Sequence, residues 1–100
     1  MKINFEQVLK ELDGKIIQIP GEGVDLTLKI VASRSLSMIF NDEQISGEEK
    51  AKRGLLAFRI YANSDIDLTV EEVALVKKLI GKAYGPLIVT QAWEMLEGKV

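Results

Sequence analysis

Three helix-start signals divide the second half of this chain and constrain its fold more than any other feature. Ser46-Gly47-Glu48-Glu49 and Thr69-Val70-Glu71-Glu72 each place a glutamate three positions after a hydroxyl residue, which is the capping box of a helix N-terminus. Gly85-Pro86 closes one helix and opens the next, because proline is accepted in a first helical turn. We therefore predict helices from Ser46 to about Ala62, from Thr69 to about Tyr84, and from Pro86 to Glu97, with Gly98 ending the last.

The first half carries weaker patterns. Apolar residues recur at helical spacing up to Leu12, which predicts a helix capped by Asn4 and stopped by Gly14; a short strand over residues 1–5 is the competing interpretation. Thr27 opens a second predicted helix, whose apolar face extends to Ile39. Two short runs favour strands that could pair with each other, and these are Lys15–Ile19 and Ile66–Leu68.

These elements predict a mainly α fold, α+β at the margin. We expect one domain over residues 1–100, a compact bundle of about four to five helices with at most a minor two-stranded sheet. The composition agrees, because 47% hydrophobic and 28% charged residues are typical of a globular protein with one core.

The absence of cysteine and histidine excludes most catalytic chemistry. A chain without cysteine has no thiolate nucleophile, disulfide or cysteine-based zinc site. Without histidine it also lacks the usual general base and the commonest transition-metal ligand. We therefore expect a non-enzymatic protein with no catalytic residue, no cofactor and no metal.

Two acidic features of the sequence could in principle hold a metal ion or act as paired catalytic carboxylates. The stretch from Asn63 to Glu72 resembles a calcium loop only in part, because Tyr61 stands at the first ligand position and Ile66 where a glycine is required. The pairs Glu48-Glu49 and Glu71-Glu72 lie in first helical turns, where acids interact favourably with the helix dipole. Helix capping therefore accounts for both features.

Nucleic-acid binding is disfavoured by charge. The net charge is −2 and the sequence pI is about 5.2, so the chain has no strong field for a polyanion. The predicted last helix, which would be the recognition helix of a helix–turn–helix, contains no lysine or arginine between Pro86 and Glu97. A small transcriptional regulator is therefore the third alternative for function.

The helix from Ser46 to Ala62 carries the candidate protein-binding residues. Its inner stripe is predicted to consist of Ala51, Leu55, Phe58 and Ala62. Leu56 and Ile60 lie off that stripe among basic residues, as in a small apolar contact with a polar rim; the alternative is that both are buried against another helix. The candidate protein-binding residues are Lys52, Arg53, Leu56, Arg59 and Ile60 of this helix, together with Leu87 in the first turn of the predicted last helix.

The last helix has the widest apolar stripe in the sequence. Ile88, Ala92, Trp93 and Leu96 belong to an arc of about 160°. We expect this helix to lie in a groove between two others, or else in a homodimer interface. In either arrangement Trp93 is predicted to be largely buried.

Three stretches together resemble a family of small proteins encoded by tailed bacteriophages and prophages. They are Leu12-Asp13-Gly14-Lys15, then Ser46-Gly47-Glu48-Glu49-Lys50-Ala51-Lys52-Arg53, and then DLTVEEVALVKKLIGKAYGPLIVTQAWEMLEG from Asp67 to Gly98. The resemblance implies a viral origin and action inside a bacterial cell. It carries over no functional residue, and the segment from Gly21 to Phe40 lies outside it.

The expected function is therefore protein–protein binding by a phage-encoded accessory factor in particle assembly, such as a tail-assembly chaperone. The alternative is an inhibitor of a host defence or housekeeping protein that acts by direct contact. The expected partner is a phage structural protein or a host protein. The wide apolar stripe of the last helix also allows a homodimer. No secretory signal or membrane-length apolar run is present in the sequence, so we expect action in the host bacterial cytoplasm.

Overall fold

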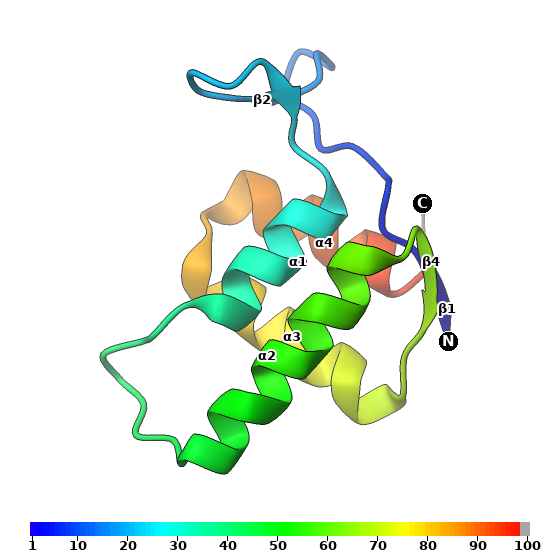
Figure 1. The fold of residues 1–100 in the computed structure, drawn as a ribbon. Helices are drawn as coiled ribbons and strands as arrows, with labels where there is room; N and C mark the ends of the chain where they lie inside the picture. Colours follow the sequence, from blue (N-terminus) through cyan, green and yellow to red (C-terminus); the bar gives the residue numbers. More distant parts are fainter. Residues whose placement is uncertain (99–100) are drawn as a thin grey trace.

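Four helices and two small antiparallel strand pairs make up the structure, a computed structural model that describes residues 1–98 (Figure 1). The predicted mainly α fold with a minor sheet is confirmed. The helices are α1 (Leu28–Ser37), α2 (Gly47–Ala62), α3 (Val70–Ala83) and α4 (Pro86–Leu96). The strands are β1 (Lys2–Asn4), β2 (Gln18–Ile19), β3 (Val24–Asp25) and β4 (Asp65–Asp67).

The helices begin where the sequence predicts. The Thr69 hydroxyl accepts a hydrogen bond from the Glu72 amide at 3.1 Å, and the Glu72 carboxylate accepts one from the Thr69 amide at 2.9 Å, so this capping box is complete. The Ser46 hydroxyl accepts from the Glu49 amide, and Thr27 caps α1 in the same way. Pro86 is the first residue of α4.

The predicted N-terminal helix is wrong, and the competing strand interpretation holds. β1 pairs with β4 so that Ile3 lies opposite Ile66. Ile3 and Phe5 are both buried, which is the two-residue alternation of a strand. The Asn4 side chain accepts from the Glu6 amide in a local turn and therefore does not cap a helix.

The predicted pairing of Lys15–Ile19 with Ile66–Leu68 is also wrong. β2 pairs instead with β3, its neighbour in sequence, around a turn in which Gly21 and Gly23 have positive φ. A pairing of neighbours closes a shorter loop than the predicted pairing would. The hairpin and the segment before it form an arm that projects from the helices (Figure 1).

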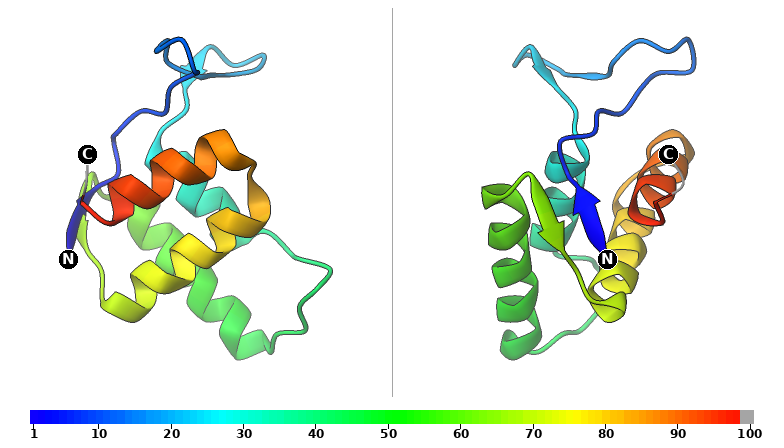
Figure 2. Two further views of the ribbon diagram at one scale, coloured as in Figure 1. Left: turned by 180° about the vertical axis from the view of Figure 1, so that it is seen from behind. Right: turned by 90° about the vertical axis from the view of Figure 1, so that its right-hand side faces the viewer.

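The helices are arranged around α1, which contacts each of the other three. Seen from the side, α2 forms one border of the helical body and α4 the opposite border (Figure 2, right). One continuous core joins the helices to the N-terminal segment, and its fully buried members include Phe5, Leu9, Leu28, Ile60, Leu79, Ile80 and Leu96. Within residues 1–98, no helix combines the length and the apolar character that crossing a membrane requires.

Candidate protein-binding surface

Leu56 and Ile60 belong to the core, so their assignment to an exposed partner surface is corrected. Ile60 is fully buried and Leu56 is 4% exposed. They lie on the side of α2 that packs on α1, together with Ala57. We call this side the α2 inner face. It was not recognised from the sequence because charged residues, Arg53 among them, share it.

The opposite side of α2 is apolar and exposed. We define the α2 outer face as Gly47, Ala51, Gly54, Leu55, Phe58, Tyr61 and Ala62, which fall within about 120° of arc. Leu55 is 66% exposed, Phe58 77% and Tyr61 61%. The stripe predicted to face inward therefore faces outward, and it lies along an uncovered border of the molecule (Figure 2, right).

A buried ion pair allows α2 to turn this way. Two nitrogens of Arg53 donate to the two carboxylate oxygens of Glu43 at 2.8 and 3.0 Å, and Nε donates to Glu49. The Arg53 side chain is 5% exposed, and that of Glu43 is 10% exposed. Because a guanidinium with three acceptors can be buried, the helix can turn its charged side inward. The required partner, Glu43, lies ten residues away in the loop before α2.

The same ion pair sets the protonation of Glu43. The hydrogen bonds from Arg53, assisted by the positive charge of Lys82 in α3, hold the pKa of Glu43 at about 2, below its ordinary value of 4.5. Glu43 in turn raises the pKa of Arg53. The loop carboxylate is therefore ionised at neutral pH and links α2 to α3, since Lys82 lies 3.5 Å from it.

Two hollows lie along one edge of the α2 outer face and meet beside Gly54, near the middle of the helix. One, of about 310 Å³, lies between α1 and α2 and is bordered by Arg34, Phe58 and Tyr61. The other, of about 540 Å³, lies between α2 and the loop that contains Phe40. Ser37 and Gly54 line both hollows, so the two form one groove with a floor of small residues at that point.

The sequence analysis does not identify the exposed apolar residues of this surface. It predicts Leu55 and Phe58 in the core and makes no prediction for Tyr61. The available signal was glycine in the middle of the supposed inner stripe: Gly54 lies on the same arc, although glycine costs a helix interior about 1 kcal/mol. A Cβ at Gly54 would meet no atom within 4 Å, so packing within the chain does not require glycine there.

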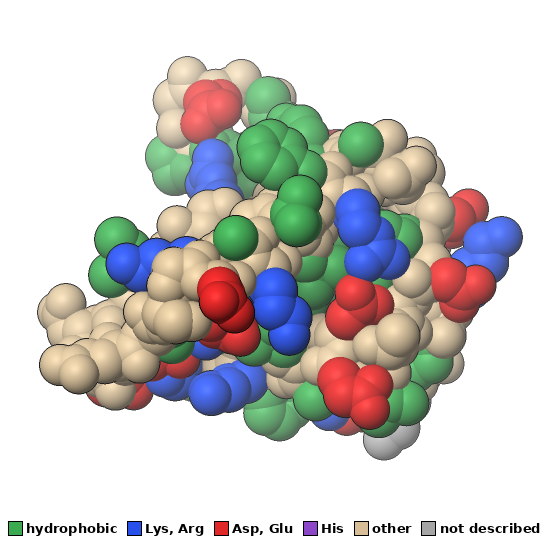
Figure 3. Space-filling view, turned by 60° about the horizontal axis from the view of Figure 1, so that its bottom comes forward, with side chains coloured by type: hydrophobic (Ala, Val, Ile, Leu, Met, Phe, Trp, Pro, Cys, Tyr) green, Lys and Arg blue, Asp and Glu red, His purple; other side chains and the backbone are tan. Residues whose placement is uncertain are grey.

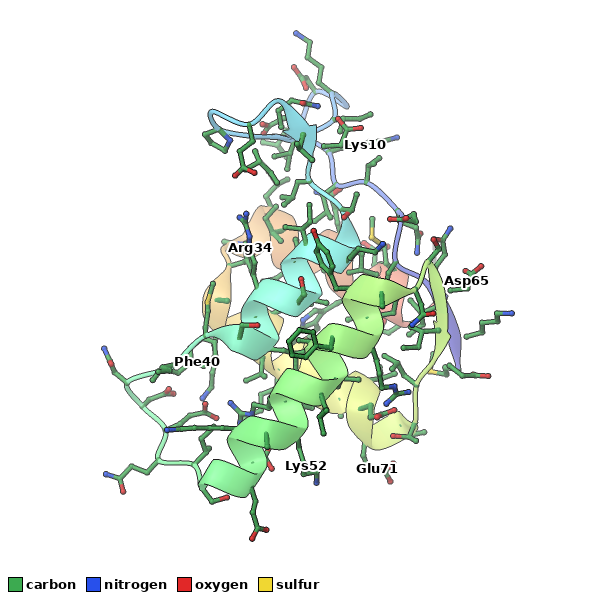
Figure 4. All side chains as sticks on the ribbon, in the orientation of Figure 1. Lys10, Arg34, Phe40, Lys52, Asp65 and Glu71 are labelled. Carbon is green, nitrogen blue, oxygen red and sulfur yellow. The ribbon has the colours of Figure 1, made fainter. Side chains whose placement is uncertain are left out.

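Basic side chains and one acidic side chain, Glu48, border the α2 outer face. Lys50 and Lys52 are exposed, and within residues 1–98 neither forms an ion pair with an acidic side chain. Figure 4 shows Arg34 on α1, where it borders the groove, and Lys52 on α2, away from the Phe40 loop. Figure 3 looks obliquely onto this side of the molecule and shows hydrophobic side chains grouped in its upper part, with basic and acidic side chains below them.

The remaining candidate residues are dispersed. Arg59 is partly exposed but already engaged, because it donates to the Glu72 carboxylate at 2.8 Å and to the Asp67 carbonyl. Leu87 is half-buried on α4, on the far border of the body from α2. The structure therefore does not bring Leu87 together with the α2 residues.

Trp93 is only partly buried, which corrects the prediction that it is largely buried. It is 38% exposed, and its indole nitrogen donates to the Lys77 carbonyl at 3.0 Å. The Lys77 ammonium lies 4.8 Å from the ring centre, and the ring passes over Gly81. α4 packs on α3 and α1 from one side, so the wide stripe extends past the buried contact.

The acidic residues between Asn63 and Glu72 have structural roles or lie exposed on β4. Glu72 completes the helix cap, and hydrogen bonds from the Thr69 backbone and from Arg59 lower its pKa. Asp65 and Asp67 lie at exposed positions of β4. Among residues 1–98 no three acidic side chains converge in a group that could hold a metal ion.

The comparisons with known proteins add no relative: no protein-family model matches the chain, and neither a curated protein nor a solved structure matches it. The α2 outer face and its groove are therefore the features from which a function can be argued.

Proposed function

We propose that this protein acts without catalysis, by binding another protein through the α2 outer face. The observation that carries the proposal is the exposure of Leu55, Phe58 and Tyr61 on one charge-free stripe. Exposed aromatic side chains within an apolar patch that has a polar border are typical of the central contacts of protein interfaces. The sequence supports the non-enzymatic part, since it contains no cysteine or histidine.

The partner surface should be apolar with acidic residues around it. Lys50 and Lys52 lie beside the stripe without acidic partners among residues 1–98, and Arg34 borders the groove. Arg34 lies 3.9 Å from Glu22 and is half exposed, so that pair contributes little. Complementary charge at the border of an interface speeds association and selects partners.

The setting that we propose is the assembly of a phage particle, with this chain as an accessory factor comparable to a tail-assembly chaperone. This part of the proposal rests on the resemblance of Leu12–Lys15, Ser46–Arg53 and Asp67–Gly98 to small phage-encoded proteins. An accessory factor that covers an apolar surface of a structural protein would need an exposed apolar face of its own, which α2 provides.

Photo-crosslinking in the cell tests the proposal. The photoreactive residue p-benzoylphenylalanine replaces Phe58 in one version of the protein and Ala74, an exposed residue of α3, in another. Illumination of bacteria that carry the phage genes should give an adduct with a phage structural protein from position 58 and none from position 74.

Binding to the purified partner then measures the contribution of the face. Phe58→Glu should weaken binding by about 30-fold or more, the effect of removing a central interface residue, while the matched control Ala74→Glu should leave it unchanged. Equal affinities of wild type and Phe58→Glu in a calorimetric titration would contradict the proposal. Adducts with host proteins alone would favour the inhibitor alternative.

A further inference from the structure

We infer that, in the free protein, a second copy of the same chain covers the α2 outer face, with the two α2 helices antiparallel and Gly54 near the two-fold axis. This inference rests on the proposed function, because the second copy occupies the same face that the partner binds and the partner has to displace it. Three features of the described residues support it.

The first feature is the order of side-chain sizes along the α2 outer face. Its N-terminal half carries Gly47 and Ala51, and its C-terminal half carries Phe58 and Tyr61. The helix spans Gly47–Ala62, so its midpoint falls between Gly54 and Leu55. An antiparallel pair centred there places the Phe58 of each copy level with the Ala51 of the other. It places the Gly47 of each copy level with the other Ala62 and about 1.5 Å along the axis from the other Tyr61.

This register matches large residues with small ones along the whole helix. Close-packed interfaces need such complementarity, because a void loses dispersion contacts and an overlap forces side chains from their rotamers. A parallel pair would instead oppose Phe58 to Phe58 and leave the glycine and alanine positions empty. In a two-fold dimer the same patch of both copies meets, so that patch has to be complementary to itself, as the α2 outer face is in this register.

The second feature is Gly54. Glycine in a helix interior costs about 1 kcal/mol relative to alanine, and a Cβ at this position would meet nothing within the chain. Close approach of a second backbone is the standard structural use of such a glycine. At the proposed two-fold axis the two Gly54 residues would allow the helices to approach each other closely.

The third feature is the charge along one edge of the helix. Glu48 and Arg59 lie on the same edge of the α2 outer face, about 20° apart around the axis. In the antiparallel register the Glu48 of one copy lies alongside the Arg59 of the other, on each side of the two-fold axis. Arg59 donates to Glu72 and to the Asp67 carbonyl, but it is about half exposed and has five N–H donors, so it can also donate to a second acidic neighbour.

Sedimentation equilibrium of the whole protein tests the inference. Between about 1 μM and about 1 mM, the range in which small interfaces associate, the mass should rise from 11.1 kDa to twice that value. Phe58→Glu should remain monomeric throughout. The control Leu12→Glu changes the most exposed leucine of the projecting arm and should dimerise like the wild type.

Cysteine cross-linking tests the register, and the absence of native cysteine makes it specific. An oxidised mixture of the Gly47→Cys and Ala62→Cys variants should give a disulfide-linked heterodimer. Each variant alone should give almost none, because its two cysteines would lie about 22 Å apart along the axis. A parallel pair would reverse this pattern.

Several outcomes would overturn the inference: a monomer at every concentration, a dimer lost in Leu12→Glu but kept in Phe58→Glu, or cross-linking of each single variant with itself. None of these outcomes would contradict the proposed function, which is tested separately by photo-crosslinking of position 58 to a different protein. Conversely, a confirmed homodimer without such an adduct would leave the self-association standing and the proposed function contradicted.

Discussion

The two faces of α2 look alike in sequence and have opposite positions in the structure. The inner face contains Leu56 and Ile60 together with Arg53, and it is buried. The outer face contains Leu55 and Phe58 without any charge, and it is exposed. An assignment of burial by hydrophobicity alone chooses the wrong face here. The position of a helix therefore depends on whether its charged residues find partners as well as on its apolar arc.

The largest expected difference between the faces is in folding stability. Ile60→Glu places a carboxylate in the core and should cost about 4–5 kcal/mol, enough to unfold a marginal domain. Phe58→Glu should change the free energy of unfolding by less than about 0.5 kcal/mol, as exposed substitutions do. Urea denaturation of both variants at low micromolar concentration measures the contrast. Similar losses in the two variants would break the comparison.

Trp93 should give an intermediate effect, since it is neither fully buried nor fully exposed. Trp93→Ala should cost about 2 kcal/mol, less than the loss expected for a fully buried tryptophan. The fluorescence of the wild type should be partly quenched by acrylamide at concentrations where the protein is monomeric. Complete protection from the quencher would show that the ring is more enclosed than its contacts with Lys77 and Gly81 indicate.

A smaller effect, of opposite sign, is expected at Gly54. Gly54→Ala should stabilise the monomer by about 0.5–1 kcal/mol, because alanine favours the helix and the added methyl group meets nothing within the chain. The measurement is thermal unfolding at a concentration below self-association. Destabilisation of the monomer would mean that the outer face is more crowded than the structure shows.

The last expected effect is a pH dependence carried by Glu43. Its folded pKa of about 2 lies below the ordinary 4.5, so its ionised form stabilises the fold above pH 4.5, and this contribution is lost as the pH falls from 4.5 toward 2. Glu43→Gln should therefore unfold at a lower temperature than wild type at pH 7, and the difference between their midpoints should shrink toward pH 2. A constant difference across that range would show that Arg53 does not lower the pKa of Glu43 in the folded protein.

The helices were predictable because their signals are local. Thr69 and Glu72 are three residues apart, and Pro86 fixes its own backbone angle, so these boundaries follow from neighbouring residues. The N-terminal strand and the orientation of α2 depend on distant residues. β1 needs β4, and Arg53 needs a carboxylate in the preceding loop. Because the sequence pattern predicts the wrong orientation of α2, it places the residues of the α2 outer face in the core and does not predict the candidate surface.

The pairing of β1 with β4 has a consequence for the order of events during synthesis. Lys2 lies opposite Asp67, and the amide of Leu68 donates to the carbonyl of Met1. Contacts between segments this far apart close a long loop and form slowly compared with local helix turns. The first strand therefore has no sheet partner until Leu68 has left the ribosome, and Ile3 and Phe5 are exposed to chaperones and to other nascent chains during that interval.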